Sequence, residues 1–523
     1  MFTTLWRRTA DRTHRPSHDH GQPRSRRLGF ERLEDRSLPS SNVVLQWNEL
    51  LLQSLPGPPS RVPLIRNMAL VHVAMFDAVN AIDRSYEPYH ADVHASRGAS
   101  PEAAAAQAAH DTLVALYPAR QAVFDAALAE DLAGIPAGQA QQGIEIGQEV
   151  ARQILDLRSS DGSAAAVGYT PPSNDPGQWQ PTPPDFSPAA AAHVPLITPF
   201  AVESSTQFRP GPPPDLTSPE YAAAFNEAKA LGSVGSTERT ADQTQVAMLW
   251  RVPLTIHQVW NRIAQDVAED QDTSLAETAR LFALLNMAFN DGLQTSFESK
   301  FHYGLWRPVE AIRRAAEDGN PATEADPAWK TLHPTTPPYP TYAGNAATIG
   351  AACATVLAGV FGGDAVAFQV DWSPYGFAGV TRSYEGFWAA ADESARSRVY
   401  GGIHFTFDSV AGQGIGAAVA DHVLDNYLSP RDNPGRGTGG SVAPLLAQPP
   451  SPAGETPSVP TAAPPTQSAL TATADGGDPG PAAEWGRGHR DGPFTAPGAE
   501  PDRLTDFPLV ELWGVPLDAA DPL

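Results

Sequence analysis

The chain has very little cysteine. Its 523 residues include a single one, Cys353, which excludes an intramolecular disulfide framework and any metal site built from several cysteines. Cys353 lies in the apolar run "IGAACATVLAGVF", and in such a run a small buried side chain is the ordinary interpretation. Redox or metal chemistry based on thiols is therefore not expected.

Long hydrophobic runs and long alternating strand patterns are also missing. The most apolar stretch, residues 346–362, is shorter than the roughly 20 residues that a membrane span needs. It consists of Ala, Gly, Thr and Val more than of Leu and Ile, so we interpret it as a tightly packed internal helix. The lack of strand patterns argues against a parallel-sheet enzyme.

Positive charge is scarce as well. The chain carries 35 Lys and Arg against 59 Asp and Glu, a formal net charge of −24. This balance argues against non-specific binding to nucleic acid or to an anionic membrane surface. A function that involves an anion therefore needs a local cluster of cations.

Residues 1–40 depart from this balance, with nine Arg and five acidic residues. No apolar segment of about 7–15 residues follows the arginines, so this is not an ordinary secretory signal. The end of the segment, "FERLEDRSLPS", resembles a short N-terminal motif of exported bacterial proteins, which implies a periplasmic or extracellular location. A disordered basic tail is the alternative interpretation.

Helical patterns dominate residues 41–430. In "PLIRNMALVHVAMFDAVNAID" apolar residues recur every three or four positions, as on a helix that faces a core. Ser100-Pro101 and Ser218-Pro219 are typical helix starts, and "SLAETARLFALLNMAFNDGLQTSFESK" is the longest predicted helix. We predict an all-α fold with proline-rich loops, and a disordered tail over the Pro-, Gly- and Ala-rich residues 431–523.

Three separate segments carry candidate chemistry. In "KFHYGLWRP", Lys300 and Arg307 are seven residues apart, close to two helical turns, so both can face the same way before Pro308 starts a new helix. In "PPYPTYAGNAATIGAA", Gly344 precedes an Ala-rich helix whose N-terminus favours an anion. Taken alone, each pattern is common in surface helices and ordinary turns.

The third segment, "SRVYGGIHFTFD", contains Arg398, His404 and Asp408. If a helix begins near His404, Asp408 lies one turn later on the same face. The carboxylate can then hold one imidazole nitrogen and leave the other as a nucleophile or a ligand. A pair at the protein surface is the ordinary alternative.

Together, K-x6-R-P, a helix preceded by glycine and S-R-x5-H-x3-D resemble the superfamily of vanadium-dependent haloperoxidases and type 2 phosphatidic acid phosphatases. Segments such as "MALVHVAMFDAVNAIDRSYEPY" and "TPFAVESSTQFRPGPPP" are similar to its soluble bacterial haloperoxidase branch, so the resemblance covers about residues 42–428. It implies a large helical domain built from two four-helix-bundle-like halves, with vanadate as cofactor.

The resemblance also implies a role for each matching position. Lys300, Arg307, Arg398 and the Gly344 N–H match the donors around a tetrahedral oxyanion. His404 matches the residue bonded to vanadium, or phosphorylated in the phosphatases, and Asp408 matches its partner.

This sequence departs from the family pattern in the second segment. Where the family has P-S-G-H, this chain has Tyr342, Ala343, Gly344 and Asn345. Ala343 lacks a hydroxyl whose hydrogen bond to a charged group contributes about 1.5–3 kcal/mol. Asn345 replaces a histidine and cannot exchange a proton near neutral pH, where general acid–base catalysis typically supplies about 10²–10⁴-fold.

Four nearby residues bear on this gap. His302 and His333 flank the motifs and are candidates to supply a proton, although a structural role is the ordinary interpretation of each. Tyr342 and Trp306 are candidates to line the pocket, although such aromatic side chains more often pack.

Three hypotheses for the function stay open. The first is a peroxidase that uses hydrogen peroxide to oxidise halide for a small organic acceptor. The second is a phosphatase that acts on a phosphate ester through a phosphohistidine. The third is a protein that binds an oxyanion without turnover, motivated by Ala343 and Asn345.

Overall fold

A computed structural model describes residues 42–54, 62–95, 98–251 and 255–431. These ranges all lie within the first of the two units into which the chain divides, Met1–Leu445. The basic segment 1–40 and all but the first residue of the predicted tail 431–523 lie outside the described residues, so those two expectations stay predictions.

The described chain is mostly helical, which confirms the all-α prediction. The helices of the first part are α1 (Val43–Ser54), α2 (Val62–Asp83), α3 (Pro101–Leu116), α4 (Gln121–Leu132), α5 (Ala137–Leu157), α6 (Pro219–Gly232), α7 (Ala241–Leu249) and α8 (Thr255–Asp270). They are followed by α9 (Leu275–Tyr303), α10 (Pro308–Arg313), α11 (Asn345–Phe361), α12 (Phe387–Tyr400) and α13 (Thr406–Asn426). Two short strands, β1 (Phe368–Asp371) and β2 (Thr381–Tyr384), pair antiparallel with Phe368 opposite Tyr384.

The predicted helix starts are present. Ser100 caps α3 by accepting the Ala103 N–H, and Ser218 caps α6 by accepting the Tyr221 N–H, each over 3.1 Å. In both helices a proline occupies the first turn, where its missing N–H costs no intrahelical hydrogen bond. Local sequence therefore determines where these helices begin.

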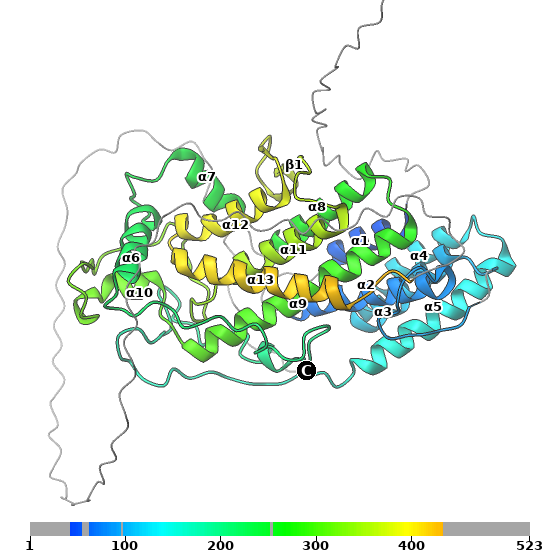
Figure 1. Cartoon of the computed structure of the whole chain (residues 1–523), viewed down its shortest axis with the longest axis horizontal. Coiled ribbons are helices and arrows are strands. Elements are labelled where there is room, and N and C mark those ends of the chain that lie inside the picture. Colours follow the sequence, from blue (N-terminus) through cyan, green and yellow to red (C-terminus); the bar gives the residue numbers. More distant parts are fainter. Residues whose placement is uncertain (1–41, 55–61, 96–97, 252–254, 432–523) are drawn as a thin grey trace, which may run out of the picture. The chain divides into compact units, whose positions relative to one another are not determined.

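The long helix α9 joins two groups of helices. On one side it packs on α2, which also contacts α3 and α5; on the other it packs on α11 and α13, and α12 packs on α11. Figure 1 shows α9 passing from the blue N-terminal helices to the yellow C-terminal ones. This arrangement agrees with the expected helical domain of two bundle-like halves.

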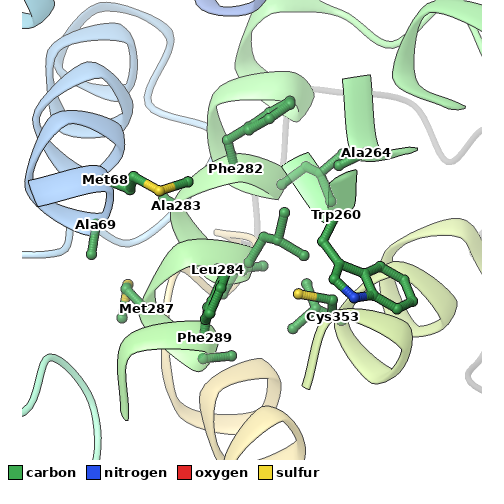
Figure 2. Packing of buried hydrophobic residues seen from close by; sticks show 14 of the residues in the cluster. Met68, Ala69, Trp260, Ala264, Phe282, Ala283, Leu284, Met287, Phe289 and Cys353 are labelled. Atoms are coloured by element: carbon green, nitrogen blue, oxygen red, sulfur yellow. The ribbon is translucent and has the colours of Figure 1, made fainter. Parts of the chain in front are cut away.

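The core lies where these helices meet (Figure 2). Met68 of α2 lies to the left of α9, and Trp260 of α8 and Cys353 of α11 lie to its right. Cys353 is fully buried, as its apolar surroundings predicted. Among the helices that the structure describes, none combines the length and the apolar character that crossing a bilayer requires.

Glycines let α13 approach α11 closely. A Cβ at Gly412 would lie 2.2 Å from the carbonyl oxygen of Gly344, and a Cβ at Gly416 would lie 2.2 Å from that of Thr348. Real Cβ atoms do not tolerate such distances, so only glycine fits at these two positions. The close approach places the start of α13, which carries Asp408, beside the start of α11.

Candidate active site

His404 lies in the short connection between α12 and α13. The helix predicted after His404 is present: α13 begins at Thr406 with Phe405 as its N-cap, so His404 itself precedes the helix. Asp408, in the first turn, accepts the Phe405 N–H over 2.9 Å. The same carboxylate oxygen, Oδ2, lies 3.0 Å from Nδ1 of His404, so the two side chains still meet.

Thr341 completes this contact and was missed by the sequence reasoning. Its Oγ1 lies 3.0 Å from Nδ1 of His404 and donates a hydrogen bond to Oδ2 of Asp408. Because a carboxylate can only accept, Nδ1 of His404 carries the proton that faces Asp408. The lone pair of the neutral imidazole is therefore on Nε2.

Arg307 lies at that second nitrogen. Its Nη1 is 3.1 Å from Nε2 of His404 and donates to the carbonyl oxygen of Ile403 over 2.8 Å. Its Nε donates to the carbonyl oxygen of Tyr339 over 2.8 Å. The guanidinium is fully buried, and these bonds hold it in one orientation.

Lys300 and Arg307 come together for a different reason from the one predicted. α9 ends at Tyr303, and Gly304 adopts a left-handed conformation with φ of +61°, so the two residues do not share a helix. Arg307 instead caps α10, the new helix predicted at Pro308. The turn between the helices, not the helical repeat, brings both side chains to one place.

A shared aromatic ring marks that place. The ring centroid of Tyr339 lies 5.4 Å from Nζ of Lys300 and 5.0 Å from Cζ of Arg307. Lys300 also donates to the carbonyl oxygen of Thr341 over 2.6 Å. Tyr339 was not singled out from the sequence, although it lies in the quoted segment "PPYPTYAGNAATIGAA".

Burial and mutual repulsion control the charges in this cluster. Burial, followed by the charges of Arg307, Lys300 and Arg398, holds the pKa of His404 well below 6.5. Burial and the charge of Arg307 likewise lower the pKa of Lys300, while burial raises that of Asp408 to about 6. His404 is therefore neutral near pH 7, in surroundings that favour an anion.

Arg398 approaches from α12. Its side chain is partly buried, and its positive charge contributes to the lowered pKa of His404. The structure thus brings Lys300, Arg307 and Arg398 into the electrostatic surroundings of one imidazole, as the three segments predicted. We call the side chains of Lys300, Arg307, Arg398, His404 and Asp408 together the cradle.

The middle segment contributes less than predicted. The Gly344 N–H, expected to donate to an oxyanion, donates to the backbone oxygen of Asp408 over 2.8 Å. Ala343 is buried, and its carbonyl oxygen accepts from Ser296 over 3.1 Å. Asn345 is partly exposed at the start of α11, and across the described ranges its side chain has no recorded hydrogen bond. Gly344 therefore serves to dock α11 on α13.

The remaining candidates separate clearly. His302 is exposed and lies edge-on to Tyr303, with no contact to a cradle residue among the described interactions. Trp306 donates to the Tyr221 hydroxyl over 3.1 Å and Tyr342 to the Gly211 carbonyl over 2.7 Å, so both pack within the fold. His333, by contrast, is 1% exposed, and burial followed by the charges of Arg251 and Arg398 lowers its pKa well below 6.5.

One atom tests whether the cradle suits an oxyanion. Nη2 of Arg307 is buried and finds no hydrogen-bond partner among the described residues. An unsatisfied buried donor on a cation costs free energy that an anion's oxygen would recover. Together with the ammonium of Lys300, this donor fits a tetrahedral oxyanion such as vanadate or phosphate.

Comparisons with known proteins point the same way. A protein-family model described as the VCPO second helical-bundle domain matches residues 280–433. The vanadium chloroperoxidase of Curvularia inaequalis is 25% identical over an alignment of 498 residues, and the match covers 72% of this chain and 80% of that protein. The matched helical-bundle domain contains every cradle residue.

Two solved structures share the fold. A bacterial vanadium-dependent iodoperoxidase superposes with a TM-score of 0.64 at 24% identity, over 75% of this chain and 97% of that one. The holo form of a bacterial vanadium-dependent chloroperoxidase superposes with a TM-score of 0.59 at 16% identity, over 71% and 93%. The chain is therefore similar to vanadium-dependent haloperoxidases, in sequence over most of its length and in fold.

Proposed function

We propose that this protein is a vanadate-dependent haloperoxidase, which oxidises a halide with hydrogen peroxide for transfer to a small organic acceptor. The overall reaction converts halide, hydrogen peroxide and one proton into hypohalous acid and water. The observation that carries the proposal is the setting of His404, a neutral imidazole between the carboxylate of Asp408 and the guanidinium of Arg307.

The cradle residues and the neighbouring Thr341 have different proposed roles in binding the oxyanion. Lys300, Arg307 and Arg398 hold the oxyanion, because their charges offset its negative charge in a buried site. Asp408 and Thr341 keep the proton on Nδ1 of His404, so the lone pair on Nε2 is the group that would hold the oxyanion. When bound, vanadate supplies the activation of hydrogen peroxide that halide oxidation requires.

Reconstitution of the full chain tests the proposal. Protein incubated with vanadate and then dialysed is expected to retain vanadium by elemental analysis, and to brominate a phenolic dye with hydrogen peroxide and bromide. His404→Ala is the control, since it removes the proposed ligand and keeps the cations. Retained vanadium with a bromination rate no higher than that of the control would contradict the peroxidase function.

The setting of Asn345 supports a second candidate, a protein that binds an oxyanion without turnover. Asn345 cannot exchange a proton, and its side chain lies partly exposed at the start of α11. This candidate predicts vanadate or phosphate binding by calorimetry, with no bromination and no hydrolysis of nitrophenyl phosphate. Hydrolysis of nitrophenyl phosphate that is lost in His404→Ala would instead indicate phosphoryl transfer.

A further inference from the structure

Tyr339 places a phenol against two cations of the cradle. Its ring centroid lies 5.4 Å from Nζ of Lys300 and 5.0 Å from Cζ of Arg307. Its carbonyl oxygen accepts the hydrogen bond from Nε of Arg307 over 2.8 Å. The ring also meets Phe297 of α9 edge-on, with 5.0 Å between the ring centroids. These contacts hold the phenol directly beside the proposed oxyanion site.

The backbone on both sides of Tyr339 is held as well. Before it, the carbonyl oxygen of Pro338 accepts the Ala190 N–H over 2.9 Å. After it, the Thr341 N–H donates to the carbonyl oxygen of Leu305 over 2.9 Å. The segment is therefore anchored to two other parts of the chain, and the ring keeps its place beside the cradle.

Tyr339 also reaches the solvent. It is partly buried, whereas Arg307 is fully buried and His404 is 2% exposed. The neighbouring aromatic side chains Trp306 and Tyr342 are buried and donate their own hydrogen bonds within the fold. Tyr339 is thus in contact with the cations and with solvent at once, where a small molecule that leaves the buried cradle can meet it.

A phenol is the class of acceptor that hypohalous acid halogenates. The hydroxyl gives electron density to the ring carbons beside it, and these carbons are the sites of attack. The charges of Lys300 and Arg307 attract that density, but an oxyanion held by them offsets their charge. Tyr339 therefore combines the chemistry of a substrate with a fixed position beside the source of the reagent.

We propose that Tyr339 is halogenated by the hypohalous acid that this protein produces. The inference rests on the proposed function, because that function supplies the oxidised halogen. A ring carbon next to the hydroxyl-bearing carbon gives an electron pair to the halogen, and the oxygen–halogen bond of the acid breaks. The hydrogen on that carbon leaves as a proton and combines with the displaced hydroxide to form water. The ring is thereby oxidised and the halogen reduced, with no further reactant.

Tyr86 provides an internal control in the same chain. It is also partly buried, its ring centroid lies 5.2 Å from Cζ of Arg280, and it lines a cavity of about 530 Å³. Arg280 and Lys300 both belong to α9, and the twenty residues between them correspond to about 30 Å along the helix. Tyr86 therefore matches Tyr339 in burial and in its cationic neighbour, but lies far from the cradle.

Peptide mapping by mass spectrometry after turnover tests the inference. The full chain loaded with vanadate is given bromide and hydrogen peroxide, and brominated peptides are recognised by the isotope doublet of bromine. Tyr339 is expected to carry about tenfold more bromine than Tyr86, because the acid forms beside one ring and reaches the other only by diffusion. Free methionine, which destroys released hypobromous acid, is expected to remove the label from Tyr86 and to leave most of that on Tyr339.

Two variants control for reactivity and for the position of the label. Hypobromous acid added to His404→Ala is expected to brominate Tyr339 and Tyr86 to similar extents, because neither ring is then beside the source. A preference for Tyr339 as large as the one seen in turnover would overturn the inference. Tyr339→Phe keeps the ring and removes the activating hydroxyl, so it should lose the label, and a label that persists on Tyr342 would overturn the assignment.

Bromination of a phenolic dye in the same reaction separates this inference from the proposed function. A brominated dye with equal label on Tyr339 and Tyr86, or with no label on Tyr339, would overturn the role of Tyr339 and leave the peroxidase function standing. A reaction that yields neither brominated dye nor brominated peptide would overturn both. A brominated dye with the label concentrated on Tyr339 would support both.

Discussion

Nη1 of Arg307 lies 3.1 Å from Nε2 of His404, so one buried guanidinium holds the imidazole nitrogen that faces away from Asp408. The arginine, Lys300 and Arg398 all act on this ring, and their positive charges repel one another. An anion in the cradle would relieve that repulsion. The relationship therefore links the stability of the protein to occupancy of the site.

Vanadate is expected to stabilise the wild type against heat. At a hundredfold excess over the dissociation constant, the free energy of unfolding should rise by about 2.7 kcal/mol. Arg307→Met should abolish the shift, because it removes the donors Nη1 and Nη2 from the cradle. Arg280→Met is the matched control: Arg280 packs on Tyr86, 5.2 Å from its ring centroid, and donates to Leu428. Differential scanning calorimetry with and without vanadate measures each shift, and a full shift in Arg307→Met would refute the link.

Thr341→Val is expected to weaken both the fold and the site. It removes the hydroxyl that contacts Asp408 and His404, at a cost of about 1–3 kcal/mol in the free energy of unfolding. The control Thr112→Val removes an equally buried hydroxyl, which donates to Ala108 over 2.7 Å within α3. Urea denaturation should show a loss in both variants, whereas calorimetry should show weaker vanadate binding in Thr341→Val alone. Equal vanadate affinity in the two variants would mean that Thr341 has no part in orienting His404.

Gly416→Ala is expected to destabilise the contact between α11 and α13. The added Cβ would lie 2.2 Å from the carbonyl oxygen of Thr348, and such overpacking costs about 1–3 kcal/mol. Gly414→Ala, two residues earlier on the same helix, meets nothing within 4 Å and should stabilise α13 by about 0.5–1 kcal/mol. Denaturant titration of both variants gives the sign of each change. A neutral Gly416→Ala would show that the two helices can separate at little cost.

His72 should make the protein sensitive to acid. The ring is fully buried on α2 against Phe282, and burial lowers its pKa to about 3. Between pH 6.5 and about 3 the unfolded chain binds a proton at this histidine and the folded chain does not. The free energy of unfolding should therefore fall as the pH falls through this window, by up to about 1.4 kcal/mol per pH unit from this group.

Two variants isolate that contribution. His72→Gln should show a flatter dependence of unfolding free energy on pH than the wild type between pH 6.5 and 4. His94→Gln, which alters a side chain that is 84% exposed, should follow the wild-type curve. Parallel curves for the wild type and His72→Gln would exclude a role of this buried ring in acid unfolding.

Much of the secondary structure was predictable from the sequence. The helix starts at Ser100 and Ser218 depend on a side chain and a backbone N–H three residues apart, so a short segment contains all the information. Gly304, whose left-handed conformation ends α9, was not singled out from the sequence, so its consequence for Arg307 was not foreseen. The helical repeat suggested the right neighbours, Lys300 and Arg307, for the wrong geometric reason.

The site was predictable in part. The spacing of the motifs led to Lys300, Arg307, Arg398, His404 and Asp408, and the structure brings their charges together. Thr341 and Tyr339 were missed, because threonine and tyrosine in a proline-rich loop carry no periodic signal. The Gly344 amide was assigned to an oxyanion, but the close approach of α13 gives it to Asp408 instead.

By itself, the sequence determined the helical class, the helix starts and the set of charged residues, because these follow from contacts within a few residues and from composition. Tertiary structure alone decided which of the two flanking histidines is buried, which loop residues hold His404, and which backbone N–H already has a hydrogen-bond partner. The physical reason is that burial and hydrogen-bond partners depend on segments far apart in the chain, and local patterns do not encode how those segments pack.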